Sequence, residues 1–351
     1  MTGGDERPIV LQIGEAIKYN HDYYNEQFSR RFRVVQNDKL DRESFIEALR
    51  KHEFGNFSAI FRPHFQSGGE MGQWDEELIS LLPSSVKIFA SAGAGFNWAD
   101  TDLLAQRGIW YANGAGASDE AVSDTALYMI LSVFRNFTMS QIAARKADPD
   151  AFTAAHKKIA TLSKNPRGQT LGIIGLGNIS TKLVKKAQAI GMRIVYFDVF
   201  RRSSEEEMAL EISYLPLDEL IATSDCVSLH VPLNKYTKHL INEDKIRLMK
   251  DGARLINTSR GEVVDEDALI KALQSGKLSA AGLDVHYHEP QVSPILAQME
   301  NVTLTTHIGG GAIDTRINFE LNAMKNIMAV VGEKGEVLGE PLTPVNRPTS
   351  K

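Results

Sequence analysis

A glycine-rich turn between a strand and a helix is the feature that most restricts the fold. The apolar stretch 171–175 precedes Gly177 and a helical pattern over 178–190. Gly175 permits a tight turn, and Gly177 lets the backbone approach a pyrophosphate bound at the positive end of the helix dipole. The next strand ends on Asp198, at the spacing from which a carboxylate binds the ribose hydroxyls of a dinucleotide. This order predicts a βαβ unit that binds NAD.

Four residues in this region bear on this prediction. Ser180 stands where the motif usually has its third glycine, which affects only the packing of helix against strand. Asp198 repels a 2′-phosphate and therefore favours NAD over NADP. Arg201 and Arg202 follow it, either as cations that accommodate a 2′-phosphate or as a solvated surface pair. NADP therefore remains an alternative cofactor.

Short strands alternate with helices along the whole chain, which predicts parallel sheets covered on both faces. The expected strands span residues 9–14, 31–35, 57–62, 86–93 and 109–114, and then 171–175, 193–198, 226–231, 253–258, 280–285 and 302–307. Helices are expected at 41–52, 75–82, 119–145, 178–190, 265–275 and 311–331, and a polar break at 164–170. The predicted fold class is α/β, with two Rossmann-like, doubly wound parallel-sheet domains and a cleft between them.

Length and composition narrow the class of protein. A chain of 351 residues is too long for one hydrophobic core, and its net charge of −5 gives no electrostatic footprint for nucleic acid or an anionic membrane. Cys226 is the only cysteine and is expected to be a buried, inert thiol. No cluster has the ligand spacing of a metal site. With no apolar stretch of about 18 residues and no signal peptide, the sequence predicts a cytoplasmic protein.

Three chemically distinct side chains follow neighbouring strands of the second half. Arg260, Glu289 and His307 each come just beyond an expected strand, and the strand over 302–307 is expected to end on His307 itself. Carboxyl ends of parallel strands share one edge, where ligands bind. An arginine forks onto a carboxylate and carbonyl, an imidazole donates a proton near neutral pH, and a carboxylate stabilises the imidazolium. The set predicts reduction of a 2-oxo acid.

Each of these residues also has a purely structural interpretation. Arg260 suits a surface salt bridge, Glu289 a turn before a proline, and His307 a helix cap. His286 and His288 compete with His307 for the catalytic role, but neither is followed by glycines. Glycines 309 to 311 are expected to let backbone and substrate come close to His307.

The chain resembles the D-isomer-specific 2-hydroxyacid dehydrogenases over nearly its whole length. The matching stretches, in the family's order, are "SAGAGFNWAD", "GIIGLGNIS", "VSLHVPL", "RLINTSRGEVVDEDALIKAL", "AGLDVHYHEP" and "THIGG". Several are most similar to a fungal subgroup that acts on D-mandelate. Asp124 departs from the family pattern, which has Glu there, and this change bears on a dimer contact only. The resemblance implies a homodimer with a small-molecule 2-oxo or 2-hydroxy acid substrate.

The resemblance also implies domain limits and site residues. Residues 1–118 and 332–351 would form a discontinuous substrate domain, 119–310 an NAD-binding domain, and 311–331 a connecting helix. Arg260 would anchor the substrate, Glu289 would pair with His307, and His307 would be the acid/base. The residues implied at the substrate are Ala94, Gly95, Phe96, Arg260 and His307. Those implied at the cofactor are Gly175, Gly177, Asn178, Ile179, Asp198, Arg201, His230, Val231, Pro232, Thr237, Thr258, Ser259, Arg260, Asp284, His307, Gly309 and Gly310.

The substrate is predicted from aromatic side chains near the expected carboxylate-binding loop. Phe96 and Trp98 lie in that loop, and Tyr287 and the stretch "RPHFQ" at 62–66 add further aromatic surface. They predict a bulky 2-oxo acid such as benzoylformate, although Phe96 and Trp98 equally suit a buried core. Alternatives are a glyoxylate or hydroxypyruvate reductase of the same family, or a non-catalytic NAD-sensing corepressor. A formate dehydrogenase would require Gln in place of Glu289.

Overall fold

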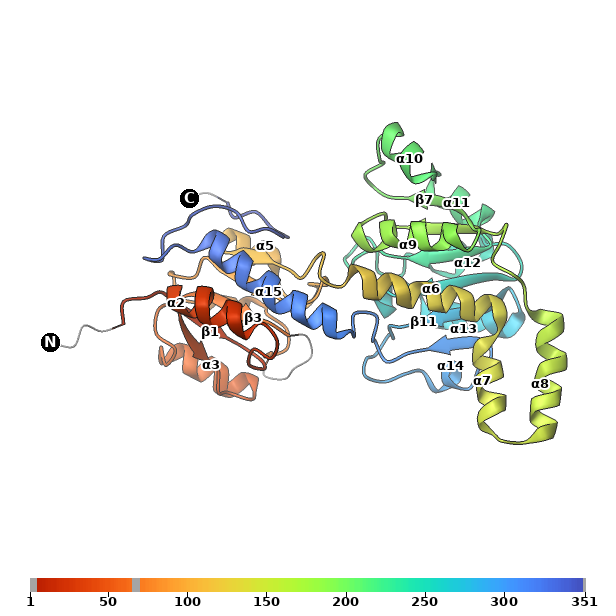
Figure 1. The fold of residues 1–351 in the computed structure, drawn as a ribbon, viewed down its shortest axis with the longest axis horizontal. Helices are drawn as coiled ribbons and strands as arrows, with labels where there is room; N and C mark the ends of the chain where they lie inside the picture. The colour runs from red at the N-terminus through yellow and green to blue at the C-terminus, as the bar shows by residue number, and fades with distance from the viewer. Residues whose placement is uncertain (1–4, 65–69, 350–351) are drawn as a thin grey trace. The chain divides into compact units, whose positions relative to one another are not determined.

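The computed structural model describes residues 5–64 and 70–349, and the chain forms two compact units (Figure 1). The first comprises Met1–Ser118 and Ala312–Lys351, and the second comprises Asp119–Gly311. Each contains one sheet whose neighbouring strands all run parallel. The predicted α/β class with two parallel sheets is therefore confirmed. Within the described part of the chain, no helix is long and apolar enough to cross a membrane.

The first unit has a five-stranded sheet in the order β2-β1-β3-β4-β5. Its elements are β1 (Ile9–Gln12), α1 (His21–Tyr23), η1 (Tyr24–Phe28), α2 (Ser29–Arg31), β2 (Arg33–Gln36), α3 (Arg42–Arg50), β3 (Phe57–Arg62), α4 (Glu76–Ser80), β4 (Ile88–Ser91), α5 (Thr101–Gln106), β5 (Trp110–Ala112) and α15 (Ile313–Val330). Apolar side chains of α3, α4 and α5 cover one face, and those of η1 and α15 cover the other. The long helix expected at 311–331 thus packs onto the first sheet.

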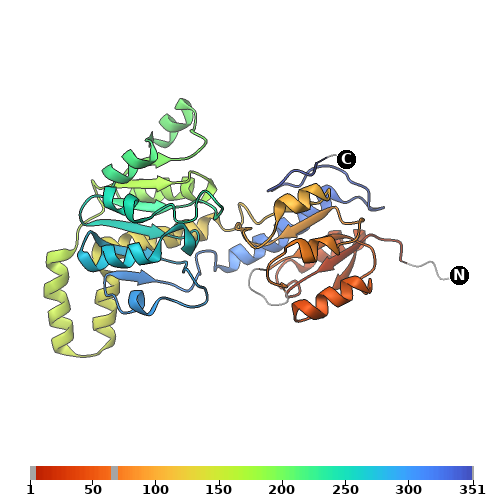
Figure 2. The same cartoon turned by 180° about the vertical axis from the view of Figure 1, so that it is seen from behind.

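The second unit has a seven-stranded sheet in the order β12-β11-β10-β9-β6-β7-β8. Its elements are α6 (Asp119–Arg135), α7 (Phe137–Arg145), α8 (Pro149–Leu162), β6 (Thr170–Ile174), α9 (Asn178–Ala189), β7 (Arg193–Phe197), α10 (Ser204–Leu210), β8 (Ser213–Tyr214), α11 (Leu217–Thr223), β9 (Cys226–Leu229), α12 (Glu243–Leu248), β10 (Ala253–Asn257), η2 (Gly261–Val263), α13 (Glu266–Ser275), β11 (Leu278–Leu283), α14 (Pro294–Ala297) and β12 (Val302–Leu304). Helices α6 and α9 cover one face, and α11, α12 and α13 cover the other (Figure 2).

Apolar runs account for the central strands, and capping side chains account for where several helices begin or end. Every residue of β3, β6, β9 and β10 is buried, as the continuous apolar runs of doubly wound strands require. Side chains of Asp41, Asp75 and Asp265 cap α3, α4 and α13 by accepting from backbone N–H groups of the first turn. Gly276 ends α13 in the left-handed conformation, as predicted.

The prediction of one helix over 119–145 is wrong. Asn136, at φ 54°, separates α6 from α7, because a left-handed residue cannot continue the helical ladder. Helix α8 is not among the expected helices, and it lies beside α7 in both views (Figures 1 and 2). Its start has a recognisable signal, since Asp148 accepts from the Asp150 N–H and Pro149 occupies the first helical position.

Candidate active site

An imidazole–carboxylate pair lies at the carboxyl edge of the second sheet. His307 Nδ1 and Glu289 Oε2 are 2.7 Å apart, and the side chain of His307 is 19% exposed. The residues Arg260, Glu289 and His307 follow β10, β11 and β12, which are parallel neighbours in the sheet. The prediction that these strand ends share one edge is therefore confirmed.

His307 is not on a strand, contrary to the prediction. Strand β12 ends at Leu304, and His307 has a φ of 55°, a left-handed conformation that costs a non-glycine residue about 1–2 kcal/mol. Asp284 imposes this turn: its carbonyl accepts from the His307 N–H at 2.8 Å, and Oδ1 accepts from the Ile308 N–H at 2.8 Å. The chain therefore leaves the strand early and turns around the Asp284 side chain.

Gly309 completes this turn. Its N–H donates to Asp284 Oδ2 at 2.7 Å, and a Cβ added to Gly309 would lie 2.7 Å from the same oxygen. Oδ1 also accepts from the hydroxyl of Thr305 at 2.6 Å. Asp284, expected at the cofactor, is 1% exposed and makes these contacts to the turn. Gly309 therefore allows the backbone to come close enough to donate to the Asp284 carboxylate.

Glu289 is oriented by two donors on different residues. Its Oε1 accepts from the His286 N–H at 2.9 Å, while Oε2 faces His307. Burial raises the pKa of Glu289, but the hydrogen bonds from His307 and His286 outweigh it, so the pKa lies below its ordinary value. The carboxylate therefore stays ionised and can stabilise a protonated imidazole. His286 Nε2 lies 2.7 Å from the Thr305 carbonyl, which occupies it structurally.

Arg260 is held in a turn that packs directly on the Glu289 turn. A Cβ on Gly261 would lie 2.2 Å from the carbonyl carbon of His286, so only glycine permits this approach. Asn257 Nδ2 donates to the Arg260 carbonyl at 2.8 Å. Burial lowers the pKa of Arg260 and the nearby Glu289 carboxylate opposes this shift. A guanidinium keeps its charge under such conditions and suits a carboxylate ligand.

The glycine turn has the form that a dinucleotide requires. Gly175 has φ 93°, and a Cβ there would meet the His230 carbonyl oxygen at 2.8 Å. A Cβ on Gly177 would meet nothing within 4 Å, so the space beside it is open, and no side chain caps α9 there. The N-terminal N–H groups of α9, which begins at Asn178 and Ile179, suit a phosphate. The residues present therefore fit a dinucleotide.

Asp198 and the arginines lie beside this turn in different ways. Asp198 Oδ2 accepts from the Leu176 N–H at 2.7 Å, which fixes the carboxylate against the glycine turn. Arg201 contacts both carboxylate oxygens of Glu207, at 2.9 and 3.0 Å. Arg202 Nη1 lies 3.3 Å from Glu206 Oε1, and its Nη2 donates to the Leu176 carbonyl at 2.8 Å. Arg202 is thus the arginine bound to the turn. The Ser180 hydroxyl donates to the Gly175 carbonyl at 2.8 Å, so it ties helix to turn.

The remaining expected cofactor residues lie on turns after β9 and β10. Burial lowers the pKa of His230 to about 4, so its imidazole is neutral, and its Nε2 lies 2.8 Å from Ser228 Oγ. The Thr237 hydroxyl donates to the Pro232 carbonyl at 2.6 Å, which closes the turn that begins at Val231. Ser259 donates to Asn257 through its N–H and hydroxyl. Thr258 Oγ1 is buried without a protein partner in the described structure.

The expected carboxylate-binding loop lies in the first unit, after β4. The Ala94 carbonyl accepts from Asn113 Nδ2 at 2.7 Å, and the Gly93 carbonyl accepts from the Gly114 N–H at 2.8 Å. Within residues 5–64 and 70–349, the N–H groups of Ala94 and Gly95 donate to no protein acceptor. Their amides can therefore bind an external anion.

The aromatic residues of the sequence analysis occupy different environments. Trp98 is partly buried and packs edge-on against the core residues Phe89 and Tyr111, with ring centroids 5.6 and 6.0 Å away. Phe96 is half-buried at the border of the same core. The hydroxyl of Tyr287 lies 2.8 Å from His239 Nε2. Phe65 and Gln66, from the stretch "RPHFQ", lie outside the described residues.

Sequence reasoning missed several residues that shape the site. Asn257 and Gly261 were visible only as part of a family stretch, and Asn113 and Arg62 carried no signal beyond their place at strand ends. Cys226 is buried, as predicted, and burial raises the pKa of its thiol to about 12. No group of three or more His, Cys, Asp or Glu side chains in the described ranges could hold a metal ion.

Comparisons with known proteins show the family to which the chain belongs. Residues 127–309 match the family model described as "D-isomer specific 2-hydroxyacid dehydrogenase, NAD binding domain". The crystal structure of apo D-mandelate dehydrogenase from Rhodotorula graminis is 46% identical, with a TM-score of 0.92, over 98% of this chain and 99% of that one. 4-Methyl-2-oxopentanoate reductase A of Aspergillus oryzae is 33% identical over 94% of this chain and 97% of its own length. Glyoxylate reductase 1 of Saccharomyces cerevisiae is 32% identical, over 93% and 92% respectively.

Proposed function

Because the chain belongs to the D-isomer-specific 2-hydroxyacid dehydrogenases, we propose that it reduces 2-oxo acids to D-2-hydroxy acids with His307 as the proton donor. The chain is an oxidoreductase of this family with an NAD-binding domain. The observation that carries the proposal is the 2.7 Å contact between His307 Nδ1 and Glu289 at the sheet edge that also holds Arg260. The experiment is a steady-state assay of NADH oxidation with a panel of 2-oxo acids.

Substrate binding is assigned to one cation and two amides. The Arg260 guanidinium forks onto the substrate carboxylate and its 2-oxo group, which polarises the carbonyl. The N–H groups of Ala94 and Gly95 donate to the other side of the carboxylate. The first unit would thus act as the substrate domain and the second as the cofactor domain.

Proton transfer is assigned to the imidazole. His307 Nδ1 is directed at Glu289, so the opposite ring nitrogen, Nε2, delivers the proton to the substrate oxygen. The ionised Glu289 stabilises the protonated ring and fixes its orientation. NADH, when bound, supplies the hydride to the carbonyl carbon. In the reverse reaction the neutral imidazole accepts the hydroxyl proton.

NADH is the proposed preferred cofactor. Asp198 presents a carboxylate where the 2′-phosphate of NADPH would lie, and this repulsion favours NADH. Arg202, bound to the glycine turn, keeps some NADPH activity, while Arg201 is engaged by Glu207. We expect a higher kcat/KM with NADH, and Arg202→Ala should reduce the residual NADPH activity more than Arg201→Ala. A clear preference for NADPH would contradict the role of Asp198.

An aromatic 2-oxo acid is the proposed substrate. Support comes from the 46% identity to a D-mandelate dehydrogenase and from the half-buried Phe96 beside the free amides. We expect kcat/KM for benzoylformate to exceed that for glyoxylate, which would bury no ring. Equal or higher efficiency with glyoxylate would favour the second candidate, a glyoxylate or hydroxypyruvate reductase, for which the Saccharomyces cerevisiae relative is the support.

A homodimer in the cytoplasm is the proposed state of the protein. Helix α8 buries none of its fourteen residues, and Phe152 on it is 62% exposed. An apolar helix face of this kind suits a contact between two copies. Sedimentation of the chain and of Phe152→Asp would test this, with a dimer expected only for the former.

A further inference from the structure

Arg62 is a buried cation at the carboxyl end of β3 that the proposed reaction does not use. The residue is 4% exposed. Its Nη1 donates to Ser91 Oγ at 3.0 Å and to the Ala92 carbonyl at 3.1 Å. Its guanidinium carbon lies 4.6 Å from the centre of the Trp98 ring. Arg62 therefore touches both the start and the end of the loop over 92–98, which carries Ala94 and Gly95.

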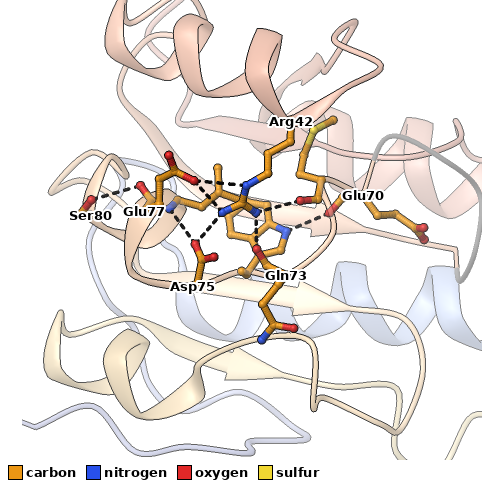
Figure 3. A network of polar contacts seen from close by, with 9 residues as sticks. Arg42, Glu70, Gln73, Asp75, Glu77 and Ser80 are labelled. Carbon is orange, nitrogen blue, oxygen red and sulfur yellow. Dashed lines mark hydrogen bonds and ion pairs between the residues drawn. The ribbon is translucent and has the colours of Figure 1, made fainter. Parts of the chain in front are cut away.

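Arg62 also forms an ion pair with Glu70, and other contacts hold the segment that follows Glu70 in place. Glu70 Oε1 accepts from Arg62 Nη2 at 2.6 Å. The segment that follows is fastened by Arg42, which donates to the carbonyls of Met71 and Gln73 and to Asp75 Oδ1 (Figure 3). In the same view the Glu70 carboxylate points away from Arg42. Glu70 is thus a fixed counter-charge for Arg62.

Other contacts also support the loop over 92–98. The Gly93 carbonyl accepts from the Gly114 N–H at 2.8 Å and the Ala94 carbonyl from Asn113 Nδ2 at 2.7 Å, so the peptide units that carry the Ala94 and Gly95 amides are each held at one point. The Trp98 carbonyl accepts from the Trp74 N–H at 2.8 Å. Among residues 5–64 and 70–349, neither amide donates to a protein acceptor. Their direction therefore depends on these bonds and on the two ends of the loop, and Arg62 contacts both ends.

We propose that Arg62 is a positioning residue that sets the direction of the Ala94 and Gly95 amides and thereby the affinity for the substrate carboxylate. This inference rests on the proposed function. Arg62 donates hydrogen bonds to Ser91 and Ala92, forms an ion pair with Glu70, and lies over the ring of Trp98. In this proposal it does not itself touch the substrate. An arginine suits this place because one planar guanidinium can donate to several acceptors while it stacks on an indole.

The proposal predicts a specific kinetic signature. The two amides hold the carboxylate equally in the ground state and the transition state, so their displacement raises KM and leaves kcat nearly unchanged. Arg62→Met should raise the KM for benzoylformate about tenfold or more, because small misplacements of binding groups have effects of this order. The inhibition constant of oxamate, a carboxylate that cannot be reduced, should rise by the same factor. NADH affinity should not change.

Arg254→Met is the matched control. Arg254 is also 4% exposed, and its guanidinium lies 4.1 Å from the centre of the Phe134 ring. It belongs to the second unit, however, and donates to the carbonyls of Val133 in α6 and of Gly252, which precedes β10. Both variants remove a buried, stacked arginine, so both should lower Tm. Only Arg62→Met should change the KM. Arg62→Lys, which keeps the charge, should recover part of the affinity.

The outcomes separate this inference from the proposed function. If none of the 2-oxo acids tested supports NADH oxidation by the wild type, the proposed function is wrong. If the wild type is active and Arg62→Met keeps its KM and oxamate affinity within about twofold, the role of Arg62 is overturned. The role is also overturned if Arg254→Met raises the KM as much. Should Arg62→Met not fold, Arg62→Lys and Glu70→Gln provide the same comparison at smaller amplitude.

Discussion

His307 is held in an unfavourable backbone conformation by its neighbours. Its left-handed backbone is unfavourable for an imidazole-bearing residue, yet the Asp284 carboxylate and carbonyl hold it there. The same turn directs Nδ1 towards Glu289. The proposed chemistry thus depends on a conformation that the neighbouring strand β11 imposes, since Asp284 directly follows that strand.

The charge on Glu289 can be tested through pH dependence. Its pKa is depressed, so the carboxylate keeps its stabilising contact above its ordinary pKa and loses it only as pH falls through the lower, folded value. In Glu289→Gln the protonated imidazole loses its counter-charge, so the alkaline limb of the kcat/KM profile for reduction should move to lower pH. If the pH profile of kcat/KM and the rates were both unchanged in Glu289→Gln, Glu289 would only stabilise the conformation of its turn.

At the scale of the element, the glycine turn between β6 and α9 contains two glycines with opposite requirements. Gly175 is needed by the protein itself, because its φ is 93° and the His230 backbone lies within 2.8 Å of an added Cβ. Gly177 is needed by no protein contact, since an added Cβ would meet nothing within 4 Å. The second glycine is therefore explained only by a ligand.

This contrast gives a paired prediction. Gly175→Ala should lower the free energy of unfolding by about 2 kcal/mol or more, from left-handed strain and overpacking together. Gly177→Ala should unfold like the wild type but bind NADH much more weakly, because its methyl group occupies the space of the pyrophosphate. Chemical denaturation and NADH fluorescence titration measure the two effects. Unchanged NADH affinity in Gly177→Ala would contradict the assignment of this turn.

The elements differ in how far the sequence predicts them. The central strands and the glycine turn follow from apolar runs and turn residues, and the shared edge of Arg260, Glu289 and His307 follows from parallel topology. The break at Asn136 and the early end of β12 do not. Both depend on tertiary hydrogen bonds, such as those from the turn to Asp284, which leave no local pattern. The packing of Trp98 on Arg62 is missed for the same reason.

At the scale of the whole molecule, a buried carboxylate joins distant parts of the first unit. Glu320 of α15 is fully buried, and its oxygens accept from the N–H groups of Lys18 and Asn20 at 2.7 and 2.8 Å. His64 Nε2 lies 3.2 Å from it. Helix α15 is thereby fastened to the turn after β1, about 300 residues away in the sequence, and to His64 after β3.

Glu320 should make the stability of the protein depend on pH. Burial raises the pKa of Glu320, but hydrogen bonds from His64, Lys18 and Asn20 outweigh it and lower the pKa to about 2. Its contribution is fully present above the ordinary glutamate pKa and is lost as pH falls towards 2. Glu320→Gln should cost about 3 kcal/mol at pH 7 and less at pH 3, measured by urea denaturation. An equal cost at both values would contradict this.

The proposed function depends above all on His307 as the proton donor in an NADH-dependent reduction of 2-oxo acids. The most direct measurement compares single-turnover NADH oxidation by the wild type and by His307→Ala, with benzoylformate as substrate and the chirality of the product determined. We expect the wild type to form the D-hydroxy acid. We expect His307→Ala to bind NADH normally but to turn over at least about 10²-fold more slowly. Near-wild-type turnover in His307→Ala, or an L-hydroxy acid product from the wild type, would contradict it.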